Sequence, residues 1–307
     1  MTSVSVGVVG GGPWGRALAR AARRTGAEVI LHSRREPPGN DDGLHVTVDY
    51  AKVCEAKLVV IAVPSPVARS VLVSLGDHLG GQHLVVHGVR GLSAETLATM
   101  SDIVREETAV RRIGALGGPV QANELTRGRP SAMVIGSKFP EVVSAVQRAF
   151  QSSSLRVFGT DDLRGLEWAS ALVGCLSIGI GYVEQAGAGP GLIAALISRG
   201  VDEAARIMAA AGCEERTMLG LGGYGDLLAS IALEDRPEVV LGKSLARGLS
   251  LEQAIELAQL RVEAIQLIPR VLQFAKERRV EAGTFQALAD ILAGERPEVL
   301  VARMFSV

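Results

Sequence analysis

Three glycines near the start of the chain have the spacing that a dinucleotide-binding turn requires. Gly10, Gly12 and Gly15 form the pattern G-x-G-x-x-G directly after the apolar run of residues 4–9. The first glycine allows a tight turn, the second lets the backbone approach a pyrophosphate, and the third lets a helix pack against the strand. Residues 16–25 follow as a helix whose N-terminal N–H groups would face the phosphates. An ordinary glycine-rich turn is the alternative, but the order strand, turn, helix predicts a dinucleotide site.

The end of the second predicted strand, residues 28–32, carries the side chains that would select the cofactor. An enzyme that prefers NAD usually places Asp or Glu there to accept hydrogen bonds from the ribose hydroxyls. This chain has Ser33, Arg34 and Arg35 instead. A hydroxyl and two guanidiniums suit a 2′-phosphate. A basic turn exposed to solvent would have the same sequence and is the alternative. We therefore predict a preference for NADPH over NADH.

Other chemically capable residues stand where predicted elements end. The apolar strand 57–63 stops at Pro64, where a loop would face the cofactor. His87 ends the strand 82–87 and titrates in the range that proton transfer at neutral pH needs. A histidine at a strand end can equally be a structural residue with its hydrogen bonds satisfied.

Asp226 and Glu184 also have two interpretations each. Asp226 ends a Gly-Tyr-Gly-Asp turn, where it could cap the helix 227–233 or face a substrate. Glu184 stands near the end of an otherwise apolar helix. It marks the exit of that helix to solvent or faces the cleft.

The elements that must position these residues fall into two groups, which predicts an α/β protein. Up to residue 160, nearly uniformly apolar strands alternate with helices, which favours a doubly wound parallel sheet with both faces covered. Within this part, residues 37–49 are polar and are expected to be a loop, and residues 49–56 a short helix. From residue 161 onward the periodicity is helical throughout. The helix 166–183 is apolar nearly all round, so we expect it to lie among other helices, including those of a partner subunit.

Composition excludes several classes of function. The 307 residues include 48% hydrophobic and 21% charged residues, with a formal net charge of −1. Nothing in this balance favours binding to nucleic acid or to an anionic membrane surface. We expect no signal peptide before the first strand, and we expect the apolar segment 169–182 to be too short to span a bilayer. We therefore predict a cytoplasmic protein.

The cysteines give no sign of a metal or redox site. The three residues lie far apart in the sequence and fit no zinc-binding or redox spacing, and they are Cys54, Cys175 and Cys213. We expect each of them to be a reduced, buried packing residue. No metal site is predicted.

Six stretches make a family resemblance specific, and their order and spacing agree with it over almost the whole chain. In sequence order they are Gly-Gly-Gly-Pro-Trp-Gly-Arg-Ala-Leu-Ala at 10–19, Ile-Ala-Val-Pro-Ser at 61–65, Gly-Gly-Pro-Val-Gln-Ala-Asn-Glu at 117–124, Ala-Ala-Leu-Ile-Ser-Arg-Gly at 194–200, Gly-Gly-Tyr-Gly-Asp at 222–226 and Arg-Val-Glu-Ala at 261–264. With them the chain resembles the bacterial NAD(P)-dependent glycerol-3-phosphate dehydrogenases.

The resemblance implies a fold, a reaction and an assembly. The fold would be a Rossmann-type NAD(P)-binding domain at 1–160, followed by a helical substrate and dimerisation domain at 161–307 of the 6-phosphogluconate dehydrogenase C-terminal type. The reaction would be reversible hydride transfer between NADPH or NADH and a phosphorylated ketone, dihydroxyacetone phosphate. Its product, sn-glycerol 3-phosphate, serves phospholipid biosynthesis. The family is usually a homodimer.

The residues of this chain match only some of the cofactor and substrate positions of the family that it resembles. For the cofactor the matching positions, with the glycine motif and the strand ends, are Gly10, Gly12, Pro13, Trp14, Gly15, Arg34, Arg35, Pro64, Ala122 and Glu263. For the substrate, Gly118 and Asp226 match, and Ser230 keeps a hydroxyl where the family has Thr. Arg236 stands near the family's phosphate-binding Arg-Asn pair, but Pro237 follows it.

The positions that would carry the chemistry depart from the family. A Lys-Gly-Leu turn becomes Arg-Gly-Leu at Arg90, and a Lys-Asn-Val stretch, whose Lys moves the proton, becomes Val-Gly-Cys at Val173. Pro190 and Gly191 also replace an Asp-Asn pair. Arginine can stabilise charge on a ketone oxygen but holds its proton too tightly to act as an acid. A missing general acid costs roughly 10²- to 10⁴-fold in rate.

We therefore expect catalysis to rest on Arg90 and Asp226, with His87 as a substitute proton donor, and three functions stay open. The chain could be a glycerol-3-phosphate dehydrogenase with a rebuilt proton relay. It could be a reductase on the same scaffold for another ketone or an imine. It could also bind NADP(H) without turnover.

Overall fold

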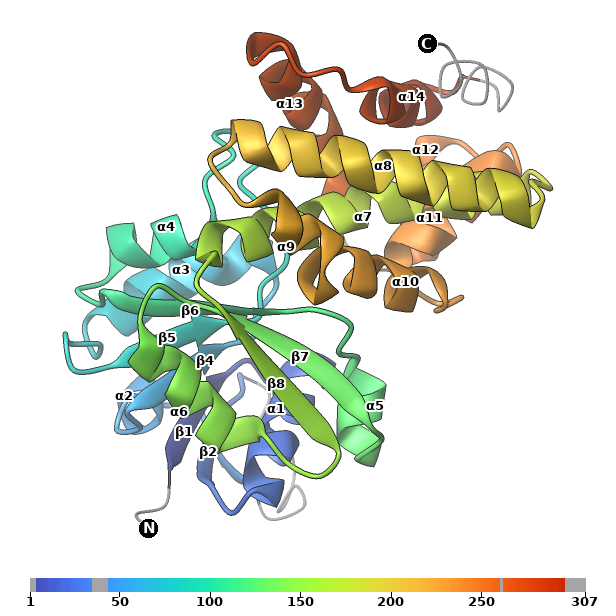
Figure 1. Ribbon diagram of the computed structural model, residues 1–307. Helices are drawn as coiled ribbons and strands as arrows, with labels where there is room; N and C mark the ends of the chain where they lie inside the picture. Colours follow the sequence, from blue (N-terminus) through green and yellow to red (C-terminus); the bar gives the residue numbers. More distant parts are fainter. Residues whose placement is uncertain (1–3, 35–43, 260–261, 296–307) are drawn as a thin grey trace. The chain divides into compact units, whose positions relative to one another are not determined.

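The computed structural model describes residues 4–34, 44–259 and 262–295 (Figure 1). These residues form two compact units. The first contains the residues up to 90 together with 99–167, and the second contains 91–98 together with the residues from 168 onward.

The first unit is built on one eight-stranded sheet with the order β3-β2-β1-β4-β5-β6-β7-β8. The strands are β1 (Ser5–Val9), β2 (Glu28–His32), β3 (His45–Thr47), β4 (Leu58–Ile61), β5 (Leu84–His87), β6 (Arg112–Gly117), β7 (Ser131–Gly136) and β8 (Leu155–Thr160). The predicted Rossmann-type, doubly wound parallel sheet is confirmed, and one of its pairings is reversed. Strand β7 runs antiparallel to β6, and every other pairing is parallel. The connection between these two strands holds the short helix α5 (Ala122–Arg127).

Helices cover both faces of the sheet, as a doubly wound fold requires. One face packs against α1 (Pro13–Arg24), α5 and α6 (Pro140–Phe150). The other face packs against α2 (Tyr50–Val53), α3 (Ser65–Gly76) and α4 (Met100–Glu107). Val8 of β1 lies in the first apolar layer and Val9 in the second, and both are fully buried. A strand enclosed on both sides has no polar face, which explains the continuous apolar runs in the sequence.

Two local predictions need correction. Part of the segment expected as a polar loop, residues 37–49, is the edge strand β3, which pairs in parallel with residues 30–32 of β2. The helix expected over residues 49–56 is a single turn. Asp49 is its N-cap and accepts a hydrogen bond of 2.8 Å from the backbone N–H of Ala51. Three residues of strand are too short to show a hydrophobic period, so the sequence carried no signal for β3.

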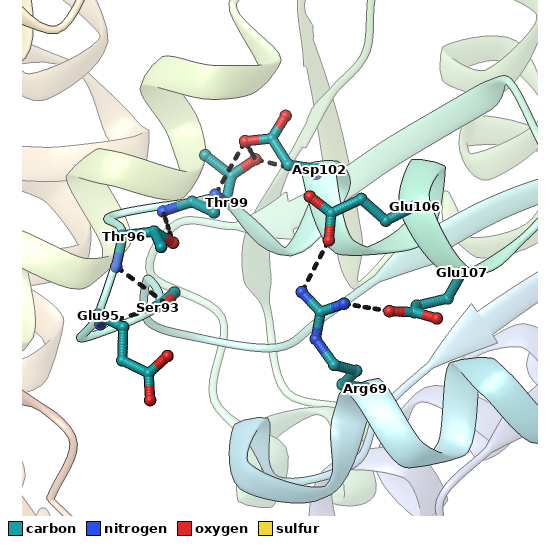
Figure 2. Close-up of polar contacts among 9 residues, drawn as sticks. Arg69, Ser93, Glu95, Thr96, Thr99, Asp102, Glu106 and Glu107 are labelled. Carbon is teal, nitrogen blue, oxygen red and sulfur yellow. Dashed lines mark hydrogen bonds and ion pairs between the residues drawn. The ribbon is translucent and has the colours of Figure 1, made fainter.

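Ion pairs link the exposed sides of helices α3 and α4 (Figure 2). Arg69 of α3 pairs with Glu106 at 2.8 Å and also with Glu107, both on α4. The start of α4 is fixed by a capping box in which the Thr99 hydroxyl accepts from the backbone N–H of Asp102 while the Asp102 carboxylate accepts from the backbone N–H of Thr99. This helix start carries Ser101, which lies against the end of β5.

The second unit is helical in all of its described secondary structure. Its elements are α7 (Leu163–Gln185), which begins in the first unit, α8 (Pro190–Ala210), α9 (Glu215–Leu219), a π-helical turn η1 (Leu221–Gly225), α10 (Asp226–Ile231), α11 (Pro237–Ala246), α12 (Leu251–Ala258), α13 (Ala264–Glu277) and α14 (Gly283–Leu292). The predicted helical domain is confirmed. Its core gathers around α7, and Trp168, Leu172 and Ile178 of that helix are at most 1% exposed.

Helix α7 is longer than its apolar sequence segment indicated. With 23 residues it is long and apolar enough to cross a membrane, so the expectation that it falls short on length is wrong. Its most apolar window is nevertheless entirely buried inside the protein. Lys243 of α11 lies 3.0 Å from Glu184 at the far end of α7, and the Glu184 side chain is about half exposed. That residue therefore marks the exit of the helix to solvent, the first of its two interpretations.

Candidate nucleotide and substrate sites

The glycine turn between β1 and α1 has the geometry of a phosphate-binding loop. Gly10 has φ +128°, and a Cβ there would lie 2.2 Å from the carbonyl oxygen of Ala62. A Cβ on Gly15 would lie 1.9 Å from the carbonyl oxygen of Gly10. Gly12, the N-cap of α1, has nothing within 4 Å of its Cβ position, and no side chain caps the helix. The turn is therefore tight at Gly10 and Gly15 and open at Gly12, where a diphosphate would approach the helix N-terminus.

The predicted cofactor-selecting residues divide between buried and exposed. Ser33 is buried, and its hydroxyl would lie 2.1 Å from a Cβ on Gly11, so the serine packs under the turn. Arg34 is exposed at the end of β2. Arg35 lies outside the described residues. The side chain of Arg16 folds back to donate a 2.9 Å hydrogen bond to the carbonyl of Gly11.

A stacked aromatic pair lies at the end of β2. The rings of His32 and Tyr50 are 4.1 Å apart between centroids. Burial holds the pKa of His32 below its ordinary value, and the positive charge of Arg34 adds to that effect. The imidazole is therefore neutral at neutral pH, and the positive charge at this strand end comes from Arg34.

Three further residues expected around the cofactor also lie in the first unit. The indole of Trp14, which follows Pro13 at the start of α1, lies against Gly88, where a Cβ would meet its Nε1 at 2.4 Å. Pro64 is exposed and is the N-cap of α3. Ala122 is the first residue of α5 and is partly buried. The glycine turn and the starts of α1 and α3 all follow the carboxyl ends of parallel strands, which is where open α/β sheets bind ligands.

His87 lies in a buried polar cluster at the end of β5. It is 1% exposed, and its Nε2 is 3.0 Å from the Glu167 carboxylate and 3.3 Å from the Ser101 hydroxyl. The same Glu167 oxygen accepts a 2.8 Å hydrogen bond from the backbone N–H of Ser101. His87 Nδ1 is buried and has no hydrogen-bond partner among the described residues. This environment favours the structural interpretation of His87.

Residues predicted to face the substrate gather in the second unit around Arg236, which is 8% exposed. Its Nη1 donates to the Ser230 hydroxyl and lies 4.0 Å from the Asp226 carboxylate, and its Nε donates a 3.0 Å hydrogen bond to Glu238. Asp226 and Ser230 are both fully buried. Asp226 follows η1 without a break and accepts from the Ser230 hydroxyl at 3.2 Å, so it does not cap the helix.

Glu238 was missed in the sequence because acidic residues are common in the first turn of a helix. The usable signal was its place two residues after Arg236, in an otherwise apolar helix. Glu167 was missed for a similar reason, since it lies in the helical run that leads into the apolar core.

The expected turn around Arg90 leads into a close contact with Glu263. Gly91 has φ +103°, and a Cβ there would lie 2.1 Å from a Glu263 carboxylate oxygen. Glu263 is the residue before α13 and is half-buried. The positive φ favours glycine directly after Arg90, because other residues rarely adopt this conformation.

The remaining predicted positions lie in two different environments. Gly118 is buried just after β6 with φ +87°. Val173 is fully buried in the apolar core around α7. Among the described residues, no group of three or more His, Cys, Asp or Glu side chains is placed to hold a metal ion.

The sequence pattern described as NAD-dependent glycerol-3-phosphate dehydrogenase N-terminus matches residues 38–143, and the C-terminus pattern of the same description matches residues 162–301. The chain belongs to this glycerol-3-phosphate dehydrogenase family. A glycerol-3-phosphate dehydrogenase (NAD(P)+) of Caulobacter vibrioides is 31% identical over 96% of this chain and 94% of its own length. One from Rhodopseudomonas palustris is 32% identical with the same coverage.

The fold is that of solved glycerol-3-phosphate dehydrogenases. The crystal structure of the Coxiella burnetii protein superposes with a TM-score of 0.88, covering 99% of each chain at 22% identity. At 22% identity, this similarity is evidence for the fold alone. The family membership and the open glycine turn are independent observations that agree on a nicotinamide nucleotide.

Proposed function

We propose that the chain is an NADP(H)-dependent oxidoreductase that interconverts a ketone and a secondary alcohol, the class of reaction for which its relatives are named. The observation that supports this most directly is the glycine turn. Gly12 leaves open space at an uncapped helix N-terminus, while Gly10 and Gly15 hold the backbone around it. In this proposal residues 1–160 bind the nucleotide, residues 161–307 bind the substrate and form a homodimer, and the protein is cytoplasmic.

In this mechanism the nicotinamide supplies or accepts the hydride, and the chain must manage the charge on the substrate oxygen. Arg90 would stabilise that charge by hydrogen bonding, and Asp226 and Ser230 would position the substrate. Arginine does not release its proton at neutral pH, and Val173 has no proton to give. Because His87 is buried against Glu167 and Ser101, the proton would come from water. We therefore expect slow turnover of dihydroxyacetone phosphate, by roughly 10²- to 10⁴-fold relative to an enzyme with a lysine acid.

A second candidate function is a reductase for a ketone or imine that carries no phosphate. The observation in its favour is that Arg236, the residue expected near a substrate phosphate, already has an internal carboxylate partner in Glu238. Binding of NADP(H) without turnover remains the third outcome. It would appear as tight NADPH binding with no reduction of any ketone offered and no oxidation of NADPH.

The cofactor assignment is tested by titrating the protein with NADPH and with NADH and following nucleotide fluorescence. We expect tighter binding of NADPH, and Arg34→Ala should weaken NADPH binding by about tenfold while leaving NADH nearly unchanged, because charge-assisted bonds to the 2′-phosphate are lost. Equal affinity for the two nucleotides would remove the argument from Ser33 and Arg34.

The reaction is tested by NADPH oxidation with dihydroxyacetone phosphate. Wild-type protein should turn over slowly, and Val173→Lys combined with Gly174→Asn should raise the rate if the scaffold still orients the ketone. Fast turnover by the wild type would show that another group already supplies the proton.

A further inference from the structure

The guanidinium of Arg236 already forms an ion pair with a carboxylate of the same chain, that of Glu238. Glu238 Oε2 accepts from Arg236 Nε at 3.0 Å, and Ser230 and Asp226 lie against Nη1. Bidentate binding of a phosphate uses two parallel N–H groups of one guanidinium. A phosphate that used the Nε–H edge would first have to displace Glu238.

Two carboxylates lie close to the guanidinium of Arg236, Asp226 at 4.0 Å and Glu238 at 3.0 Å. Asp226 is fully buried and the Glu238 side chain is 16% exposed, so solvent screens them weakly. A phosphate placed on this guanidinium would be repelled by both of these carboxylates.

The backbone holds Glu238 in this position. A Cβ on Gly242 of α11 would lie 2.0 Å from the carbonyl oxygen of Ile178, and a Cβ on Gly181 of α7 would lie 2.6 Å from the carbonyl oxygen of Val239. Helices α7 and α11 therefore touch through their backbones just after Glu238. This contact leaves the first turn of α11 little freedom to move away from α7.

Glu238 also faces α7 with its second oxygen. A Cβ on Gly174 would lie 3.5 Å from Glu238 Oε1, which is ordinary van der Waals distance. The negative charge of Glu238 contributes to the raised pKa of Cys175, after the larger effect of burial. The carboxylate therefore lies between Arg236 and the Gly174 segment of α7.

We propose that Glu238 is a specificity-determining residue that excludes phosphorylated substrates by taking the place of the phosphate on Arg236. The substrate class that fits is a small ketone or imine without a phosphate, uncharged or bearing an amine that the carboxylates can bind. This inference rests on the proposed reductase function for its substrate, but the exclusion of an anion is a binding property that needs neither cofactor nor turnover.

The first test measures binding of inorganic phosphate by calorimetry to the full chain without nucleotide. Wild-type protein should bind phosphate weakly, and Glu238→Gln should bind it at least about tenfold more tightly, because the near-isosteric amide removes the charge. Adding Arg236→Gln to Glu238→Gln should abolish the gain, and Glu238→Asp should keep phosphate binding weak. Glu184→Gln is the matched control, since it removes another carboxylate between α7 and α11, the one paired with Lys243.

The second test compares two ketones that differ only in the phosphate, hydroxyacetone and hydroxyacetone phosphate, in NADPH oxidation. Glu238→Gln should raise kcat/KM for the phosphorylated ketone by at least about tenfold, mainly through KM, while kcat/KM for hydroxyacetone changes little. A purely helix-stabilising role for Glu238 would lower the melting temperature and leave this ratio unchanged.

Three outcomes would overturn the proposal: equally tight phosphate binding by wild type and Glu238→Gln, an equal gain in Glu184→Gln, or a gain that survives loss of Arg236. Absence of NADPH binding or of any turnover would instead count against the proposed function. The phosphate titration would still decide the role of Glu238.

Discussion

At the scale of single residues, two glycines of the proposed nucleotide site differ in what surrounds them. Gly15 lies where a Cβ would strike the backbone of Gly10, so packing requires glycine there. Gly12 has free space around its Cβ position and an ordinary φ of −75°, so neither packing nor backbone conformation requires glycine there. In the proposed site, the space at Gly12 is left for the ligand.

This difference predicts opposite effects of the same substitution. Gly12→Ala should change the free energy of unfolding by less than about 1 kcal/mol but weaken NADPH binding at least about tenfold, because the methyl group enters the phosphate space. Gly15→Ala should destabilise the protein by about 1–3 kcal/mol through overpacking. Urea unfolding and NADPH titration of both variants check this, and normal NADPH binding by Gly12→Ala would contradict it.

The three cysteines give a prediction about reactivity. None of them forms a disulfide and all are buried, and burial raises the pKa of Cys54 to about 11 and that of Cys175 further. The thiolate is the reactive form, so at pH 8 the native protein should react with a thiol reagent very slowly. Complete, fast labelling should appear only after unfolding. Rapid labelling of one thiol in the native state would show that local opening exposes it.

At the scale of elements, the second unit is organised by backbone contact between α7 and α11. At two glycines the backbones of these helices approach each other without a side chain between them. Gly181 of α7 faces the carbonyl oxygen of Val239, and Gly242 of α11 faces the carbonyl oxygen of Ile178. That contact fixes where the first turn of α11, with Arg236 and Glu238, lies on α7.

Gly242→Ala should therefore destabilise the protein by about 1–3 kcal/mol, because its Cβ would lie 2.0 Å from a carbonyl oxygen of α7. Gly174→Ala is the control within the same pair of helices. Its Cβ meets Glu238 at an ordinary 3.5 Å, and alanine is the better helix former, so stability should stay equal or rise by up to about 1 kcal/mol. Equal destabilisation by both changes would show that the crossing is not close.

A second element-scale prediction concerns the start of α14. The buried Glu203 carboxylate of α8 accepts 2.9 Å hydrogen bonds from the backbone N–H groups of Thr284 and Phe285, and burial raises its pKa above the usual value of 4.5. The folded state therefore holds this proton to higher pH than the unfolded state. Its contribution to the free energy of unfolding should fall as pH rises through the window just above 4.5.

The measurement is urea unfolding of wild type and Glu203→Gln between pH 4 and 7. The difference in unfolding free energy, wild type minus variant, should decrease with rising pH in that window. Glu215→Gln, a first-turn residue of α9, serves as a control for general charge effects. A difference that increases with pH would show that the two N–H donors outweigh burial.

At the scale of the whole molecule, the predicted site residues are divided between two units with separate cores. The predicted glycine turn lies in the first unit, and the Arg236 cluster and Glu263 lie in the second.

Binding of NADPH should stabilise the folded chain by mass action. At a concentration about 100 times its dissociation constant, NADPH should add about 2.7 kcal/mol to the free energy of unfolding, which corresponds to a rise of roughly 5–10 °C in melting temperature. Gly12→Ala should show a much smaller rise at the same concentration. No shift in wild-type protein would contradict nucleotide binding.

The sequence alone determined the class of fold, the glycine turn and the division into a sheet part and a helical part, because hydrophobic periodicity and glycine spacing are local properties. It did not reveal the reversed strand β7, the short strand β3 or the burial of His87, which depend on pairing between distant segments. Only the tertiary structure joined Arg236 to Glu238 and set that pair against Gly174. Long-range packing decides which charges meet, and no local pattern records it.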